Sequence, residues 1–333
     1  MSSAVDGPAG DAYVSTGELP ERDLVERLVH EAHDLYRLNR DGEVSQAYPA
    51  LASVPADLFG VCVVGTAGGL FAAGDADYEF TIMSISKPFV FALVCDLIGP
   101  DDARKRLGVN STGLPFNSLY AVERSADGRT NPMVNAGAIA TTSLAAGDRV
   151  EDRWRFIHEG LSRFAGRELS LDPDVYSSAS AANSRNQSIA RLLESFDRVY
   201  CPSADAVELY TRQCCLRVSA RDLAVMGATL ADGGVNPVTE EQVVDGSVCH
   251  YTLAVMLTAG LYETSAEWLY DVGLPAKSGI GGGIVTVSPG KGGMGTFAPP
   301  LDREGNSVKG QLVAKFLSAR LGMDLLISSP TGR

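Results

Sequence analysis

Ser84-Ile85-Ser86-Lys87-Pro88 is the stretch on which the interpretation of this chain depends. Ser84 and Lys87 are three residues apart, so in a helix they lie on one face, one turn from each other. The lysine can accept the proton of the serine if its surroundings lower its pKa toward neutrality. Proline is best tolerated in the first turn of a helix. We therefore expect a helix to begin near Ser84, with the hydroxyl at its positive end, where a developing oxyanion is stabilised.

A second stretch, Ser288-Pro289-Gly290-Lys291, has the same spacing. Its Pro-Gly pair predicts a turn, so Lys291 would not lie one helical turn above Ser288. The spacing alone therefore has little specificity. Ser84 is a candidate nucleophile, although the spacing alone favours an ordinary serine cap at a helix N-terminus.

Length and composition limit the class of protein. The chain has 333 residues, of which 45% are hydrophobic, enough for a large core in one two-lobed domain or in two domains. Its 28 basic and 41 acidic residues give a net charge of −13. Phosphate binding needs a concentrated basic surface, so we expect no nucleic acid and no anionic membrane as partner.

The cysteines and histidines show no metal-binding spacing. No C-x-x-C pair occurs, and the adjacent Cys214-Cys215 is a poor basis for a disulfide framework. A reducing compartment is the simpler interpretation. Cys249-His250 alone is too little for a zinc site, and we assign no metal.

The two ends of the chain differ in character from its body. Residues 1–20 are small, polar and acidic and lack the basic and apolar regions of a secretory signal. No stretch approaches 18 apolar residues without charges, so no membrane span is expected. We predict a disordered tail over residues 1–20, a C-terminal tail over 326–333, one catalytic domain over 21–325, and a cytoplasmic location.

Hydrophobic periodicity predicts strands toward both ends of the chain and helices between them. The expected strands span residues 59–64, 70–73, 278–287 and 292–298. The expected helices span residues 21–38, 136–146, 153–164, 186–195, 204–213, 220–230 and 247–261, with a last one capped by Asn306 and ending near Leu321. This order predicts an α+β fold, a mixed sheet sandwich flanked by helices, with a helical subdomain inserted over about residues 100–235.

Other segments could also carry chemistry. Lys277-Ser278-Gly279 begins the late strand and could line an acyl-transfer site, because S-x-x-K and a K-[ST]-G strand occur together in penicillin-recognising serine acyltransferases. Asn135 and Asn186 each lie where a helix starts, so each could cap that helix or offer its amide to a polar substrate. The glycines at 281–283 and 290–293 match no phosphate-loop spacing, and we expect them to allow close packing of a strand against a helix.

Taken together, these segments resemble the serine-dependent glutaminases, which share the penicillin-binding-protein/β-lactamase type of fold. The similarity runs from about Asp23 to about Leu321. It rests on S-I-S-K-P (84–88), N-P-M-V-N-A-G-A-I (131–139), A-T-L-A-D-G-G (228–234), G-L-P-A-K-S-G-I (273–280) and P-P-L-D-R-E-G-N-S-V-K-G (299–310). The resemblance implies a β-lactamase/DD-peptidase-like fold and a homo-oligomer, either a dimer or a tetramer.

The resemblance also implies a reaction. L-glutamine and water would become L-glutamate and ammonia through an acyl-enzyme, with no cofactor. Ser84 would be the nucleophile, Lys87 its proton partner, and Tyr262 the tyrosine that works with the lysine. The implied substrate-binding groups are the side chains of Asn135, Asn186 and Tyr210 and the backbone N–H of Ile280, which forms an oxyanion hole with that of Ser84.

The chain departs from the family pattern on the substrate side. Ala179 stands where the family usually has a glutamate that binds the α-ammonium of the substrate, and Met83 stands where it has Gln or Glu. Ala47 occupies the place of a tyrosine that lines the pocket. A buried ammonium without a carboxylate partner costs several kcal/mol, so we expect free L-glutamine to bind poorly unless another acid substitutes.

Three functions therefore stay open from the sequence. The first is a glutaminase with altered amino-group recognition. The second is an amidase of the same mechanism acting on an amide without a free α-amino group. The third is a non-catalytic glutaminase-like binding protein, although the retained Ser84, Lys87, Tyr210 and Tyr262 argue against it. A β-lactamase or DD-peptidase is a weaker fourth.

Overall fold

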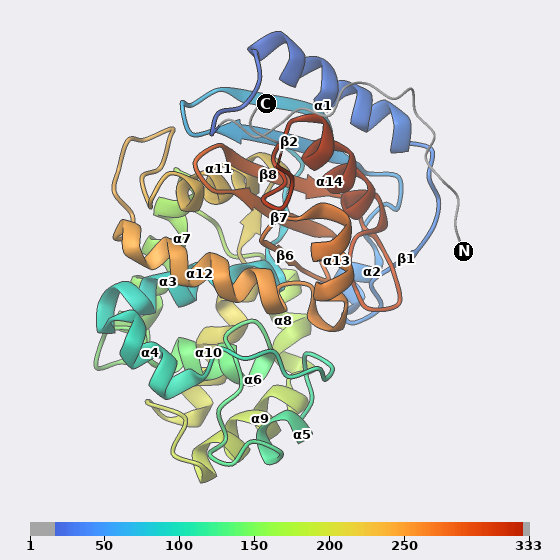
Figure 1. Ribbon diagram of the computed structural model, residues 1–333. Helices are drawn as coiled ribbons and strands as arrows, with labels where there is room; N and C mark the ends of the chain where they lie inside the picture. The colour runs from blue at the N-terminus through green and yellow to red at the C-terminus, as the bar shows by residue number, and fades with distance from the viewer. Residues whose placement is uncertain (1–16, 329–333) are drawn as a thin grey trace.

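The computed structural model describes residues 17–328. The predicted tails over residues 1–20 and 326–333 lie outside these residues except for 17–20 and 326–328. The molecule has a half built around a sheet and a half built from helices (Figure 1). Both ends of the described chain contribute to the sheet half, as the order of predicted elements indicated.

The main sheet has five strands in the order β3-β2-β8-β7-β6. These strands are β2 (Gly60–Gly65), β3 (Leu70–Gly74), β6 (Ala276–Ser278), β7 (Gly283–Ser288) and β8 (Gly292–Phe297). Every pairing is antiparallel, so the expected mixture of strand directions is absent from the part of the chain described. Short connections explain the antiparallel pairs β2–β3, β6–β7 and β7–β8. The central pair, β2 with β8, is antiparallel although its two strands come from opposite ends of the chain.

Helices cover both faces of this sheet. α1 (Arg22–Tyr36) and α14 (Val308–Arg320) pack on one face, together with α13 (Ser265–Val272), and α11 (Ala220–Ala231) packs on the other (Figure 1). α11 lies within the segment that we expected to form the helical subdomain, yet it contacts β8, β7 and β2.

Glycines in β8 allow α11 to lie directly on the strand. A Cβ added to Gly295 would come within 2.0 Å of the carbonyl oxygen of Ala220, and one added to Gly293 within 2.3 Å of that of Ala224. Any larger residue would therefore push the helix away from the sheet. Within the later glycine cluster, close packing against a helix is thus confirmed for Gly293, whereas a Cβ on Gly292 would meet the carbonyl oxygen of Val64 on β2 and Gly290 lies in a turn with a φ of 76°.

The helical half contains most of the remaining elements. Its helices are α4 (Pro100–Leu107), α5 (Tyr120–Glu123), α6 (Asn135–Ser143), α8 (Pro173–Ala181), α9 (Ser184–Ser195) and α10 (Ser203–Cys214). The remaining helical elements are η1 (Met83–Ile85), α3 (Ser86–Ile98), α7 (Val150–Ala165), α12 (Gly246–Ala259) and η2 (Tyr262–Thr264). Among them, η1 and α7 contact elements of both halves. Small elements complete the chain: α2 (Pro49–Ala52) and the two-stranded pairs β1 (Glu43–Val44) with β9 (Pro300–Leu301) and β4 (Phe80–Thr81) with β5 (Arg217–Val218).

Two element boundaries differ from the prediction. The strand expected over residues 278–287 is divided by a turn, because β6 ends at Ser278 and β7 begins at Gly283. The last helix is capped by Ser307, whose hydroxyl accepts from the N–H of Gly310. Asn306 is instead buried, with its side-chain amide donating to Thr264. The turn at Ser288–Lys291 is confirmed, as it joins β7 to β8.

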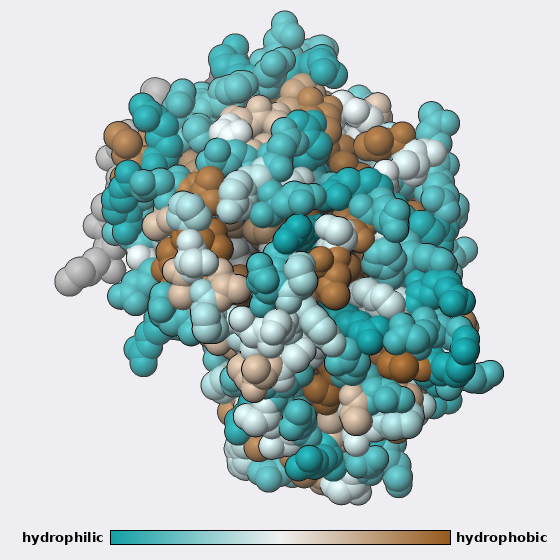
Figure 2. Space-filling model, turned by 180° about the vertical axis from the view of Figure 1, so that it is seen from behind, coloured by the Kyte–Doolittle hydropathy of each residue, from teal (hydrophilic) through white to brown (hydrophobic). Residues whose placement is uncertain are grey.

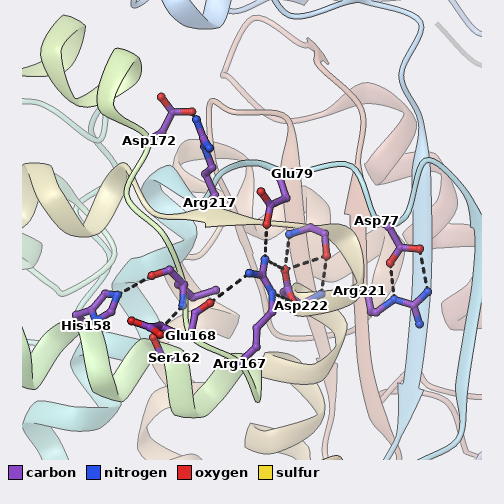
Figure 3. Close-up of polar contacts among 12 residues, drawn as sticks. Asp77, Glu79, His158, Ser162, Arg167, Glu168, Asp172, Arg217, Arg221 and Asp222 are labelled. Atoms are coloured by element: carbon purple, nitrogen blue, oxygen red, sulfur yellow. Dashed lines mark hydrogen bonds and ion pairs between the residues drawn. The ribbon is translucent and has the colours of Figure 1, made fainter.

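An ion-pair cluster fastens α11 to the segment that leads toward Ser84 (Figure 3). Asp222 accepts from the N–H and hydroxyl of Ser219 at 2.7 and 2.9 Å, which completes a capping box. The Arg167 guanidinium binds both oxygens of Asp222, at 2.9 and 2.7 Å, and reaches Glu79 at 2.9 Å. Since Asp222 is buried and bound bidentately, this pair is of the strong kind.

The surface agrees with the acidic composition. The face opposite to that of Figure 1 is mainly hydrophilic, and its hydrophobic side chains form separate patches (Figure 2). Among the residues described, no single helix combines the length and the hydropathy needed to cross a membrane. The pair Met83–Ile98 and Pro100–Leu107 passes that test only in combination, and it is bent by 119°.

Candidate active site

Ser84 lies in the 3-10 turn η1, directly before α3. The prediction that a helix begins near Ser84 is therefore confirmed, with Pro88 in its first turn. Both Ser84 and Lys87 are buried. The residue before the serine, Met83, has a φ of 48°, which is uncommon for a residue other than glycine. Backbone conformations of this kind cluster at functional sites.

The turn at 279–282 packs against the segment that carries Ser84. A Cβ added to Gly281 would lie 2.6 Å from the carbonyl oxygen of Thr81, so only glycine allows this approach. The turn is closed by the N–H groups of Gly279 and Gly282, and these two bonds leave out the N–H of Ile280. Ile280 lines the same cavity as Ser84, as its implied role requires.

The Lys87 side chain is almost completely buried from solvent. Its Nζ donates to Oδ1 of Asn135 at 2.8 Å and lies 5.9 and 5.8 Å from the ring centres of Tyr210 and Tyr262. Burial lowers the pKa of Lys87 from 10.5 to about 7, while the neighbouring Cys214 thiol acts in the opposite direction. A large share of the lysine is then neutral at physiological pH and able to accept a proton.

Tyr262 lies between the nucleophile and the late strand. Its hydroxyl donates to the carbonyl oxygen of Ser278 at 3.4 Å and is also hydrogen-bonded to Ser84. Burial raises the pKa of Tyr262 to about 12, against the smaller lowering effects of the Ser84 and Ser278 side chains, so the phenol stays protonated at neutral pH. With a φ of 57°, Tyr262 is a second strained residue beside the site.

Lys277 of the K-S-G segment is a second buried lysine behind Tyr262. Its Nζ donates to the carbonyl oxygens of Gly260 at 2.6 Å and Ser278 at 2.9 Å, and it lies 3.8 Å from the ring centre of Tyr262. Burial and, to a smaller extent, the charge of Lys87 hold the pKa of Lys277 well below its usual value. This segment thus lies behind Tyr262, and none of its three residues is among those that line the cavity.

The side chain of Asn135 belongs to the site and does not cap a helix. α6 is preceded by Val134 at its cap, and Oδ1 of Asn135 accepts from Lys87 and from the hydroxyl of Tyr210, the latter at 3.1 Å. Its Nδ2 donates to Oδ1 of Asn186 at 3.0 Å. Burial raises the pKa of Tyr210 well above its usual value, so its hydroxyl remains a donor.

These groups surround one small cavity of about 60 Å³. It is lined by Tyr48, Met83, Ser84, Phe116, Asn135, Ala179, Asn183, Asn186, Tyr210, Thr211, Cys214 and Ile280. Lys87 and Tyr262 stand directly behind this lining, so the structure brings all the predicted site residues together.

Sequence reasoning missed five of the lining side chains. Thr211 and Cys214 follow Tyr210 on α10, and the i, i+4 spacing of Tyr210 and Cys214 could have indicated the cysteine. Nothing in the sequence pattern indicated Tyr48, Phe116 or Asn183, since their positions depend on contacts between distant segments.

One part of the cavity wall is apolar. Ala179 and Met83 belong to one buried hydrophobic cluster, and no carboxylate is among the lining side chains of the residues described. The expected loss of a pocket tyrosine at Ala47 is wrong. The extended conformation of Tyr48, with φ −137° and ψ 142°, places the neighbouring phenol in the lining instead.

Among residues 17–328, no group of three or more His, Cys, Asp or Glu side chains could hold a metal ion. All six cysteines are free thiols. The polar groups at the cavity or directly behind it are a serine, a threonine, a lysine, phenols, amides and a thiol, a set that suits acyl transfer by a serine.

Known proteins are similar in sequence to this chain over most of its length. Residues 42–326 match the family model described as Glutaminase. Glutaminase 2 of Yersinia pestis is 65% identical over 96% of this chain and 94% of its own length. Glutaminase of Brucella canis is 48% identical over 85% of this chain and 90% of its own.

Solved structures agree. A probable glutaminase, ybaS, has a TM-score of 0.91 and 41% identity, covering 92% of this chain and 100% of that one. Mglu in its glutamate form has a TM-score of 0.86 and 36% identity, covering 92% of this chain and 71% of that one. The predicted β-lactamase-like fold class is confirmed. With its family model, its relatives and its fold all in agreement, this chain belongs to the glutaminase family.

Proposed function

We propose that this protein hydrolyses L-glutamine to L-glutamate and ammonia through an acyl-enzyme on Ser84. The observation that carries the proposal is a buried serine one helical turn from a buried lysine whose pKa lies at about 7. The named relatives support glutamine as the substrate. Binding without catalysis would not require a buried lysine with a pKa near neutrality.

The first half of the reaction uses Lys87 as base. Neutral Lys87 takes the proton of Ser84, and Oγ attacks the carboxamide carbon of the substrate. The negative charge that develops on the carbonyl oxygen is stabilised by the backbone N–H groups of Ser84 and Ile280. Tyr262 passes its proton to the leaving nitrogen and takes the proton held by Lys87 in return, so both groups regain their starting protonation states. The C–N bond breaks and ammonia departs, which leaves the ester on Ser84.

In the second half of the reaction, water hydrolyses the ester on Ser84. Water loses a proton to Lys87 through Tyr262 and attacks the ester carbon. The C–O bond to Ser84 breaks, Oγ takes the proton back from Lys87, and the carboxylic acid product loses its own proton to solvent. Asn135, Asn186 and Tyr210 offer neutral donors and acceptors to the polar end of the substrate.

The pH dependence of kcat/KM should show an acid limb near pH 7. Protonated Lys87 cannot accept the proton of Ser84, so the rate should fall about tenfold for each pH unit below the pKa of about 7. Ammonia release from L-glutamine between pH 5 and 9 measures this. A flat profile down to pH 5 would contradict Lys87 as the base.

A second substrate class is favoured by one observation. The cavity lining of the residues described contains no carboxylate to pair with an α-ammonium, and Ala179 and Met83 present apolar surface. An amide of the same length without a free α-amino group would avoid burying an unpaired charge. Comparing L-glutamine with its N-acetyl and des-amino counterparts distinguishes the two substrates.

Replacing Ala179 with glutamate should increase kcat/KM for L-glutamine roughly tenfold, by the magnitude of a favourable buried ion pair. Ala179 is buried within the lining, so the new carboxylate would face the substrate rather than bulk solvent. Ala179→Gln, which has the same shape without the charge, is the matched control. Equal changes for L-glutamine and for the des-amino amide would refute a role for this position in reading the amino group.

We also propose a cytoplasmic homo-oligomer with one catalytic domain over residues 21–325, without a nucleic-acid or membrane partner. The six free thiols support a reducing compartment. The net charge of −13 argues against anionic partners. Size-exclusion chromatography with light scattering tests the oligomeric state.

A further inference from the structure

A chain of side-chain amides runs from the catalytic lysine to a threonine on another helix. Oδ1 of Asn135 accepts from Lys87, and its Nδ2 donates to Asn186. Nδ2 of Asn186 donates to Oδ1 of Asn183 at 2.8 Å, and Nδ2 of Asn183 donates to Oγ1 of Thr211 at 2.7 Å. Every link therefore points in the same direction, away from Lys87.

Thr211 determines that direction. Its hydroxyl donates its only proton to the carbonyl oxygen of Val207, four residues earlier on α10, at 2.7 Å. Toward Asn183, the hydroxyl can then only accept. Asn183 must present its Nδ2 to Thr211 and its Oδ1 to Asn186, and the same constraint passes on to Asn135.

Asn183 does not make the hydrogen bond that is usual for an asparagine at the start of a helix. It is the cap residue of α9, where an asparagine side chain normally accepts from a backbone N–H of the first turn. Here its side chain makes no capping bond, and the residue is buried against the cavity. Its amide is therefore part of the hydrogen-bonded series of side chains and does not cap the helix.

The direction of the Asn135 amide matters for the base. An amide has nearly the same shape when its oxygen and nitrogen are exchanged. With Oδ1 toward Lys87, the amine donates and keeps its lone pair for the proton of Ser84. With Nδ2 toward Lys87, the amide would donate to that lone pair and block it. Tyr210 alone does not prevent the exchange, since its hydroxyl can donate or accept.

We infer that Asn183 is a positioning residue for the reaction, which together with Thr211 sets the orientation of the Asn186 and Asn135 amides and so keeps Lys87 available as a base. The inference rests on the proposed role of Lys87. It assigns to Asn183 no contact with the reacting atoms.

The test compares Asn183→Ala, Thr211→Val, the double variant and wild type. Each single change should lower kcat/KM roughly tenfold, and the double variant should be no worse than either, because both break one chain. Thr211→Ser keeps the acceptor oxygen and should recover most of the rate lost in Thr211→Val. Ser188→Ala, at an exposed position on α9, is the control for handling and folding.

The pH profile distinguishes a change in the orientation of the Asn135 amide from a general opening of the site to water. Loss of the Oδ1 acceptor disfavours charged Lys87, so the acid limb of Asn183→Ala should move to lower pH by about one unit. If the substitution merely let water in, Lys87 would become easier to protonate and the limb would move to higher pH. An unmoved or raised limb, or additive losses in the double variant, would overturn the inference. Absence of turnover by wild type would instead overturn the proposed function.

Discussion

Replacement of Ser84 by alanine should abolish ammonia release, lowering kcat by at least about 10⁴-fold, the scale on which removal of a serine nucleophile acts in other hydrolases. The variant should fold normally, because Ser84 contributes only a small side chain to the wall of a cavity. Burst kinetics and mass spectrometry with a slow amide should show an acyl adduct on wild type alone.

The chain supplies its own matched control, the second serine with the same spacing to a lysine. Ser288 donates to the carbonyl oxygen of Met323 at 2.8 Å and takes no part in the cavity. Ser288→Ala leaves that buried carbonyl without its donor and should lower the free energy of unfolding by about 1–2 kcal/mol with kcat unchanged. Comparable loss of activity in both variants would contradict Ser84 as the nucleophile.

Lys87→Met should have the second largest effect, a fall in kcat of roughly 10³-fold, as expected for loss of a general base. The same substitution should make the protein more stable. The pKa of Lys87 is about 7 in the folded protein against 10.5 for a free lysine, so the unfolded chain binds the proton more tightly. Its burial therefore opposes folding, fully below about pH 7 and progressively less as the pH rises to 10.5.

Chemical denaturation at two pH values measures this effect. At pH 7, Lys87→Met should raise the free energy of unfolding by about 2 kcal/mol or more, and at pH 10 the gain should be much smaller. Lys315→Met, which removes an exposed lysine paired with Asp271, is the control and should show little pH-dependent gain. A destabilised Lys87→Met protein at pH 7 would mean that the lysine is charged and well paired in the folded state.

Much of the site could be predicted because its parts are local. Spacing alone places Ser84 and Lys87 on one helical turn, and Pro88 indicates where that helix begins. The turn at Ser288–Lys291 follows from Pro-Gly. The resemblance then pointed to Asn135, Asn186, Tyr210, Tyr262 and Ile280, all of which the structure places at or directly behind one cavity.

Other features could not be read from the sequence. The break between β6 and β7 depends on the turn at 279–282 packing against the segment before Ser84, a contact between residues about 200 apart. Ser307 replaces Asn306 as a helix cap because Asn306 is committed to Thr264. Tyr48 supplies the phenol that position 47 lacks, and its place in the cavity lining depends on its extended conformation at the start of α2.

The sequence by itself determined the reacting pair, the order of elements and the membership of a glutaminase-like group, because each follows from local spacing or from motifs. Only the tertiary structure decided how Lys87 is brought near neutrality, which side chains line the cavity, and which way the amides from Asn135 to Asn183 point. A pKa depends on burial, and the direction of an amide depends on its partners. Both are set by residues that meet only when distant segments pack together.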